Sequence, residues 1–219
     1  MRVVFRLRKP QEHQTVLRVL RRMILESGLA FEPAKINIKW PRFAYGPALP
    51  LGVSAAREYV DVYLVSFVAE KEVQDKLQKA GNDNVEILKV FRVPYVFPSV
   101  QQLATVALYN ISGHLADDLS AQTLEKYFTS DMEVVFRASN GLSYTQSLAA
   151  YVRSFQRVST HQYQLWLQSI KGKWINPCVF LFAALGKEVP AEEGFIPDDF
   201  TVVREGLFWQ DNQGEIHLI

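Results

Sequence analysis

The hydrophobic periodicity of the first 93 residues changes in a fixed order, and this order constrains the fold more than any other feature. Apolar and polar residues alternate over residues 2–8, and apolar residues then recur with helical spacing over residues 12–27. Alternation returns over residues 35–40, 58–65 and 85–93, while residues 70–79 have a short helical pattern. The predicted order is β-α-β-β-α-β, the split βαβ arrangement of a ferredoxin-like unit.

A similar pattern begins again after Pro94 and Pro98. Asn176 followed by Pro177 is typical of a helix start, because Asn caps the first turn and Pro fits the first helical position. We therefore predict an α+β protein of two ferredoxin-like subdomains with antiparallel sheets, residues 1–96 and a decorated copy at 97–219. In the second subdomain we expect helices at 119–128 and 178–185, strands at 104–111, 132–137, 148–155, 163–170 and 200–209, and a closing hairpin through 211–218.

The net charge of +1 conceals two oppositely charged ends. Residues 1–43 carry ten Lys and Arg against three Glu, a net +7, whereas residues 186–219 have a net charge of −6. A basic subdomain and an acidic tail are compatible with an anionic ligand at one end or with head-to-tail association of two copies. A further interpretation is that the two ends neutralise each other within one fold.

Composition excludes several classes of protein. The single cysteine, Cys178, allows no internal disulfide and no thiolate zinc cluster, which is typical of a reducing compartment. No apolar run approaches the roughly 20 residues of a membrane-spanning helix. Arginines interrupt the first nine residues, where a signal peptide would be apolar. We expect a cytoplasmic protein with no membrane partner.

One segment resembles a known family. Residues 41–53 (PRFAYGPALPLGV), followed by residues 58–62 (EYVDV), are similar to the uncharacterised bacterial family of radical-SAM-linked domains. The resemblance implies a protein that acts beside a radical S-adenosylmethionine enzyme, either fused to its C-terminus or as a separate small protein. It implies no family-wide reaction. The chain departs from the usual family pattern at residues 12–15 (EHQT), 36–40 (INIKW) and 139–144 (SNGLSY), so a family site at those segments is altered here.

Candidate catalytic residues are few. One cysteine cannot hold an iron–sulfur cluster that needs three, so this chain is not itself the radical enzyme. His13, His114, His161 and His217 lie far apart and have no metal-ligand spacing. Cys178 precedes four apolar residues, which favours a buried packing role over that of a nucleophile. We predict no metal, no cofactor and no assigned catalytic residue, and a hydrolase or nuclease that uses His13, His114 or His161 is the third-ranked hypothesis.

The basic N-terminal segment is the main functional candidate. If Val3, Phe5 and Leu7 pack against helices, alternate arginines point to the open side of the sheet, with Tyr59 or Tyr63 as aromatic neighbours. Ferredoxin-like modules hold single-stranded RNA on such a face by stacking bases and pairing phosphates with cations. The predicted RNA- or anion-binding residues are Arg2, Arg6, Arg8, Arg18, Arg21, Arg22, Lys35, Lys39 and Arg42. The predicted groove wall is Tyr45, Gly46, Pro47, Pro50 and Gly52.

These observations favour a non-catalytic accessory module that presents RNA, or another anionic substrate, to a partner such as a radical-SAM enzyme. The alternatives are a protein-interaction scaffold, whose basic and acidic ends pair with a partner or another copy, and a protein with no role in nucleic-acid binding.

Overall fold

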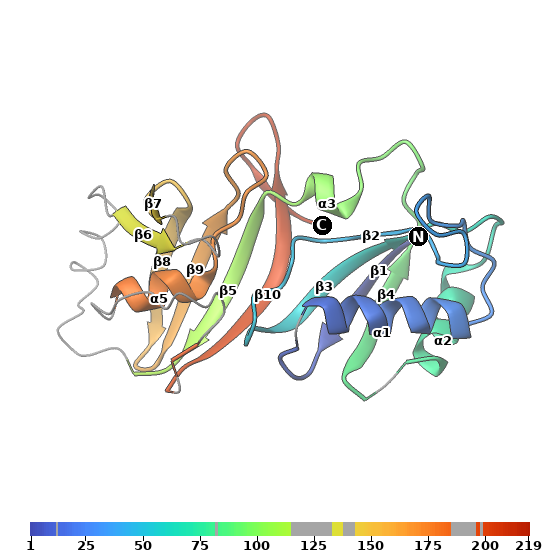
Figure 1. Cartoon of the computed structure of the whole chain (residues 1–219), viewed down its shortest axis with the longest axis horizontal. Coiled ribbons are helices and arrows are strands. Elements are labelled where there is room, and N and C mark those ends of the chain that lie inside the picture. The colour runs from blue at the N-terminus through green and yellow to red at the C-terminus, as the bar shows by residue number, and fades with distance from the viewer. Residues whose placement is uncertain (12, 82, 115–132, 138–142, 185–195, 198) are drawn as a thin grey trace. The chain divides into compact units, whose positions relative to one another are not determined.

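The structure is a computed structural model that describes residues 1–219 except 12, 82, 115–132, 138–142, 185–195 and 198 (Figure 1). It contains two compact units. The first comprises residues 1–49, 54–104 and 206–219, and the second comprises residues 50–53 and 105–205. This division differs from the predicted boundary at residues 96/97, because the C-terminal segment 206–219 belongs with the first unit.

The first unit is a mixed α+β structure built on an antiparallel sheet. Strands β1, β3 and β4 are joined by antiparallel pairing in the order β4-β1-β3, and β2 pairs with β3. The predicted mixed α+β class with antiparallel strand pairing is confirmed. The elements are β1 (Arg2–Leu7), α1 (His13–Glu26), β2 (Phe43–Tyr45), β3 (Ser54–Val62), α2 (Glu70–Lys79), β4 (Val85–Phe91) and α3 (Val100–Leu103).

The apolar stripe of α1 forms much of this unit's core. Val16, Leu20, Met23 and Ile24 are buried as the helical spacing predicts, and α1 lies across the sheet in Figure 1. α2 packs against β4 through its own buried residues. Gly28 has φ +68°, a left-handed conformation that suits glycine after the helix end.

The predicted strand over residues 35–40 is wrong. Pro33 and Pro41 form an isolated antiparallel bridge, so the residues between them make a turn, and the paired strand is β2, further along the chain. Ile36 is 97% exposed and Ile38 79%, so the apolar alternation in this segment buries nothing. Prolines on both sides remove the N–H groups that a longer strand would need.

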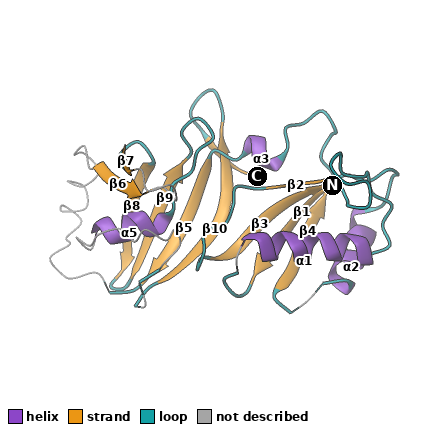
Figure 2. Cartoon of the chain, viewed as in Figure 1, coloured by secondary structure: helices purple, strands orange, loops and turns teal. Residues whose placement is uncertain are grey.

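The second unit is also a mixed α+β structure. Figure 2 shows its helices in purple and its strands in orange. β5, β9 and β8 form an antiparallel sheet in that order, and β6 pairs with β7 as a separate hairpin. The predicted pairing of two strands around residue 160 is confirmed by the β8–β9 hairpin, whereas β7 was not predicted. The elements are β5 (Val106–Ser112), β6 (Glu133–Arg137), β7 (Ser143–Ser147), β8 (Val152–Ser159), β9 (Gln162–Gln168) and α5 (Pro177–Ala184).

The C-terminal strands follow the prediction. β10 (Thr201–Gln210) and β11 (Ile216–Leu218) form the expected closing hairpin. Asp211 accepts backbone hydrogen bonds from Gln213 and Glu215, both 2.9 Å, and Gly214 has φ +89°. The predicted helix 119–128 lies outside the described residues, as do residues 186–195 and 198 of the acidic tail 186–219. No helix in the described ranges has the length and apolarity needed to cross a membrane.

Cys178, the only cysteine of the sequence, lies in the first turn of α5. The Asn176 side chain accepts a hydrogen bond of 2.9 Å from the Cys178 N–H, as predicted for a cap. Cys178 is 2% exposed, and burial raises the pKa of its thiol to about 12. The predicted packing role of this cysteine is confirmed.

Cys178 is therefore expected to resist alkylation while the protein is folded. At pH 8 a thiol with a pKa of about 12 is ionised in only about one molecule in ten thousand, against about a quarter for an ordinary cysteine. Modification by iodoacetamide, followed by mass spectrometry, should be about a thousandfold slower than in urea. Equal rates in the folded and unfolded protein would contradict the burial of this thiol.

Candidate functional site

The candidate site of the first unit begins with three backbone segments that bond to one another in a ring. The Glu32 N–H donates to the Tyr63 carbonyl at 2.8 Å, and the Tyr63 N–H donates to the Arg42 carbonyl at 3.3 Å. The Arg42 N–H closes the ring by donating to the Glu32 carbonyl at 2.7 Å. Tyr63 is separated from the other two residues by more than 20 positions, and the ring holds the three backbone segments beside one another.

The Arg42 guanidinium joins these side chains into one cluster. Its Nη1 lies 2.7 Å from Glu32 Oε2 and 2.8 Å from the Tyr95 hydroxyl oxygen, and the guanidinium lies 4.0 Å from the centre of the Tyr63 ring. The hydrogen bond to Tyr95, then that to Glu32, keeps the pKa of Arg42 above its usual value. The two tyrosine rings meet edge to face at 6.1 Å. The cluster is held in one geometry, and the positive charge of Arg42 is paired there with the Glu32 carboxylate.

A pocket of about 170 Å³ opens beside this cluster. Tyr63, Phe67, Tyr95 and Phe97 give it four aromatic lining residues. The lining also holds Arg92 and the carboxylates of Glu32 and Asp61, whereas Arg42 lies beside the pocket. Pockets that enclose a whole cofactor or drug-sized molecule measure roughly 300–1,000 Å³. A volume this small suits one planar ring rather than a complete cofactor.

The rim of the pocket is aromatic and exposed to solvent. Phe67 is 78% exposed, Tyr95 68% and Phe97 46%, and Val96 between the last two is also exposed. The Arg92 guanidinium lies 3.9 Å from the centre of the Phe67 ring. Large aromatic side chains exposed in a group are unusual on a protein surface and indicate a place where something binds.

The sequence predicted Arg2 on an open face of the sheet, and the structure shows that Arg2 is instead buried. It is 2% exposed, and its Nε and Nη2 donate to the two carboxylate oxygens of Asp61 at 2.7 and 3.0 Å. The same carboxylate accepts the Val100 N–H at 2.7 Å, and Arg2 also donates to the Pro98 carbonyl at 3.1 Å. Residues 98–100 thus cover this end of β1, and Arg2 has a structural role behind the pocket-lining Asp61.

Other predicted cations lie away from the pocket. Arg6 and Arg8 both pair with Glu86, at 3.5 and 3.2 Å, near the opposite end of β1 from Arg2. Arg22 pairs with Glu26 one helical turn further along α1 at 2.7 Å, and Arg18 is exposed on the same helix. Exposed pairs of this kind contribute roughly 0–1 kcal/mol, so they leave these cations accessible to a ligand.

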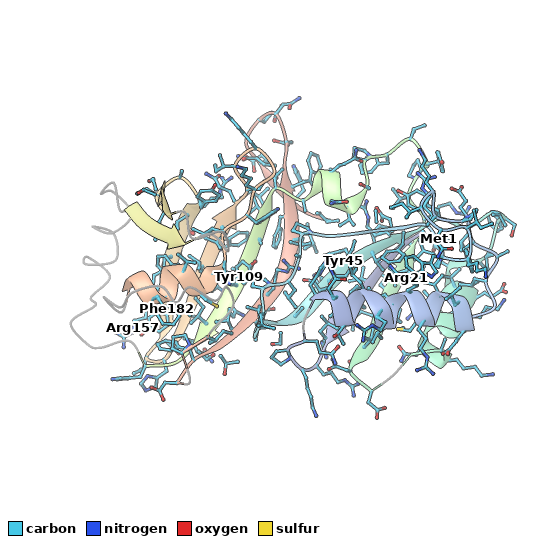
Figure 3. The ribbon with its side chains drawn as sticks, viewed as in Figure 1. Met1, Arg21, Tyr45, Tyr109, Arg157 and Phe182 are labelled. Carbon is cyan, nitrogen blue, oxygen red and sulfur yellow. The ribbon has the colours of Figure 1, made fainter. Side chains whose placement is uncertain are left out.

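The turn that precedes Arg42 brings further cations to the first unit's surface. The guanidinium of Arg21, labelled in Figure 3, lies 4.0 Å from the centre of a Trp40 ring. Lys35 and Lys39 are exposed on the same turn as Trp40. Trp40 is two residues before Arg42, so a second arginine–aromatic pair adjoins the Arg42 cluster along the chain.

The predicted groove wall is mostly core. Tyr45, Gly46 and Pro47 are buried, and the Tyr45 hydroxyl lies 3.2 Å from a carboxylate oxygen of the buried Glu58. A Cβ on Gly46 would lie 2.8 Å from a methyl carbon of Leu207, so the glycine allows close packing there. Pro50 and Gly52 are half-buried, and Gly52 takes a left-handed φ of +83°. The first three residues are therefore not a surface wall, because the connection packs inward.

Sequence reasoning missed most of the pocket. Phe67, Arg92, Tyr95 and Phe97 were not singled out, while Tyr59, considered as an exposed aromatic, is fully buried. Burial raises the pKa of the Tyr59 phenol to about 12. The pair of aromatic residues between Pro94 and Pro98 could have indicated an exposed aromatic surface, because prolines on both sides keep those residues out of a core strand.

Two of the four histidines that are far apart in the sequence lie close together in the structure. His13 packs edge-on against Tyr45 with ring centres 5.2 Å apart. His114 and His161, which are 47 residues apart, lie beside each other in the second unit. Within the described ranges no group of three or more His, Cys, Asp or Glu side chains is placed to hold a metal ion.

Comparison with protein families identifies the chain's relatives. A family model described as an uncharacterized protein conserved in bacteria, DUF2344, matches residues 13–177, about three quarters of the chain. The chain belongs to the DUF2344 family. The matched DUF2344 region contains Glu32, Arg42, Tyr63, Arg92 and Tyr95. No curated protein matches the chain.

Proposed function

We propose that this DUF2344 chain is a non-catalytic accessory module that binds single-stranded RNA at the pocket of the first unit and presents it to a partner enzyme. The observation that carries the proposal is a ring-sized pocket with exposed aromatic rings, with Arg92 in its lining and Arg42 in the cluster beside it. Proteins that bind single strands combine the same two elements, aromatic faces for the bases and cations for the phosphates.

The size of the pocket favours one base at a time. A volume of about 170 Å³ matches a single planar group, and the lining offers the Tyr63 and Phe97 rings to it. Neighbouring bases then find Phe67 and Tyr95 exposed at the rim. Arg92, which is exposed, is placed to meet a phosphate between such bases.

The accessory role and the partner rest on the resemblance of residues 41–63 to radical-SAM-linked domains. A module of that kind would hold an RNA segment while the partner, a radical-SAM enzyme, carries out the reaction. The exposed cations of the first unit, Lys35 and Lys39 among them, extend the positive surface along which a strand could run.

The proposal is tested by fluorescence anisotropy with a labelled single-stranded RNA of about 12 nucleotides, a length within the site sizes of single nucleic-acid-binding folds. The variant R42A/R92A removes two charges at the pocket, and R6A/R8A removes two charges at the other end of β1. We expect the pocket variant to bind at least about tenfold more weakly at 50 mM salt. The slope of log affinity against log salt concentration should be smaller in magnitude by about 1.4, which is the contribution of two phosphate contacts on a single strand.

The matched variant R6A/R8A should bind within about threefold of the unmodified protein, because both of its arginines lie away from the pocket, beside Glu86. Thermal melting of each variant checks that it is folded. An equal loss in both variants would show diffuse attraction to the basic segment, and absence of binding at 50 mM salt would overturn the proposal.

A protein-interaction scaffold is the second candidate function, because the pocket rim also exposes aliphatic side chains. Val65 is 59% exposed and Val96 93%, and these side chains fit an apolar partner surface better than they fit RNA. The substitution V65S/V96S separates the candidates. It should leave RNA affinity unchanged and should weaken association with a protein partner docked at this rim.

A further inference from the structure

Two histidine side chains of the second unit face each other on its surface. His114 follows β5, and His161 lies in the turn between β8 and β9. Their Nδ1 atoms are 3.4 Å apart, with ring centres at 5.2 Å and ring planes inclined by 53°. Both residues are exposed, so the pair is open to small solutes.

Backbone pairing brings the two loops together. Ser112 of β5 lies opposite Gln162 of β9, and the Gly113 N–H donates to the His161 carbonyl at 3.0 Å. The Phe200 ring packs directly on Gly113, where a Cβ would lie only 2.3 Å from a ring carbon. Glycine is therefore required at position 113, and the position of His114 is set by this close packing.

The turn that carries His161 is braced by Arg157, labelled in Figure 3. The Arg157 guanidinium donates to the Ser159 carbonyl at 3.3 Å and to the Thr160 carbonyl at 3.0 Å. With two of its carbonyls bound to one planar group, the turn has little freedom to move the imidazole. Both residues are thus held by structure around them as well as by the contact between their rings.

We propose that His114 and His161 form a binding site for a divalent transition metal, with Zn²⁺ as the reference ion. A zinc ion binds imidazole nitrogen at about 2.0–2.1 Å in tetrahedral geometry, which places two ligand nitrogens about 3.4 Å apart. The Nδ1 atoms have this separation. At 3.4 Å the same two atoms make a long hydrogen bond in the structure, and a bound metal ion would replace its proton.

The chemistry of the site follows from its two ligands. Neutral imidazole suits Zn²⁺, Cu²⁺ and Ni²⁺ and does not suit Mg²⁺ or Ca²⁺, which prefer oxygen. Two protein ligands leave the remaining coordination positions to water or to a ligand from solution, which makes an open, exchangeable site. The site belongs to the second unit, and the proposal does not depend on RNA binding at the first.

Isothermal titration calorimetry with ZnCl₂ tests the proposal on the full chain. We expect one Zn²⁺ per chain, and a loss of affinity of at least about tenfold for each of H114A and H161A, because either change destroys the chelate. The control is H217A, which removes an exposed histidine that pairs with Asp211 at 2.8 Å rather than with another imidazole. This control should bind Zn²⁺ like the unmodified protein, and Mg²⁺ should not compete.

Nuclear magnetic resonance supplies a second measurement that a change in stability would not mimic. Addition of Zn²⁺ should shift the Nδ1 resonances of His114 and His161 together and leave those of His13 and His217 in place. Zinc binding that survives in H114A and H161A, binding lost in H217A, or no binding by the unmodified protein would each overturn the proposal. Circular dichroism confirms that the variants are folded.

Discussion

Replacing Asp61 with Ala is expected to lower the free energy of unfolding by about 3–5 kcal/mol, the cost of breaking a buried ion pair by removing one partner. Arg2 would keep its charge while 2% exposed and would lose both hydrogen bonds to the carboxylate. The Val100 N–H, which donates to the same carboxylate, would also lose its acceptor. Urea denaturation followed by circular dichroism measures the change.

Two further variants test whether the loss of stability comes from the buried ion pair between Arg2 and Asp61. R22A breaks the exposed pair with Glu26 on α1 and should cost no more than about 0.5 kcal/mol. The double substitution R2M/D61L removes both charges together, so it should cost less than D61A alone. A loss below about 1 kcal/mol for D61A would mean that Arg2 finds water or another partner, and that residues 98–100 do not seal this part of the unit.

Arg2 also illustrates what periodicity can and cannot predict. Alternation over residues 2–8 correctly predicted β1 and placed Val3, Phe5 and Leu7 on a buried face. It also placed Arg2 on the other face, but whether that face is open depends on a segment almost 100 residues away. The covering residues 98–100 have no local pattern that points back to β1, so the burial of Arg2 could not be predicted.

The candidate site shows the same division between local and long-range information. Arg42 was predicted as a binding residue from local charge alone, and it is central to the cluster. Its partners Glu32, Tyr63 and Tyr95 come from three other places in the sequence, joined by the backbone ring and by the Tyr95 hydroxyl. Composition identified the charge, but only tertiary structure shows which aromatic rings surround it.

The histidine pair extends this argument to the second unit. His114 and His161 are 47 residues apart and have no metal-ligand spacing in the sequence, but the fold brings their Nδ1 atoms to 3.4 Å. The β8–β9 hairpin was predicted, but its register with β5 was not, and that register places the two imidazoles together. Long-range strand pairing is specified by side-chain packing across the sheet, which a single strand's pattern does not contain.

Substitution of Tyr95 is expected to separate the two parts of the RNA recognition that we propose for the pocket. Tyr95 offers an exposed ring at the rim, and its hydroxyl holds Arg42 Nη1 at 2.8 Å. Removing the ring with Y95A should weaken binding of single-stranded RNA by about 1–3 kcal/mol, roughly 5- to 150-fold, the usual cost of losing one stacked base. Anisotropy at several salt concentrations measures both the affinity and its salt dependence.

The comparison with Y95F distinguishes stacking from the positioning of Arg42. Y95F keeps the ring, so most of the affinity should remain, and Arg42 stays bound to Glu32 and stacked on Tyr63. Y95A should leave the salt dependence unchanged, because a ring contacts no phosphate, whereas R42A should reduce it. If Y95F weakens binding as much as Y95A, the hydroxyl acts through Arg42 and the ring does not stack on a base. If neither variant changes affinity, RNA does not enter this pocket, and its exposed aromatic rim is a surface for a protein partner.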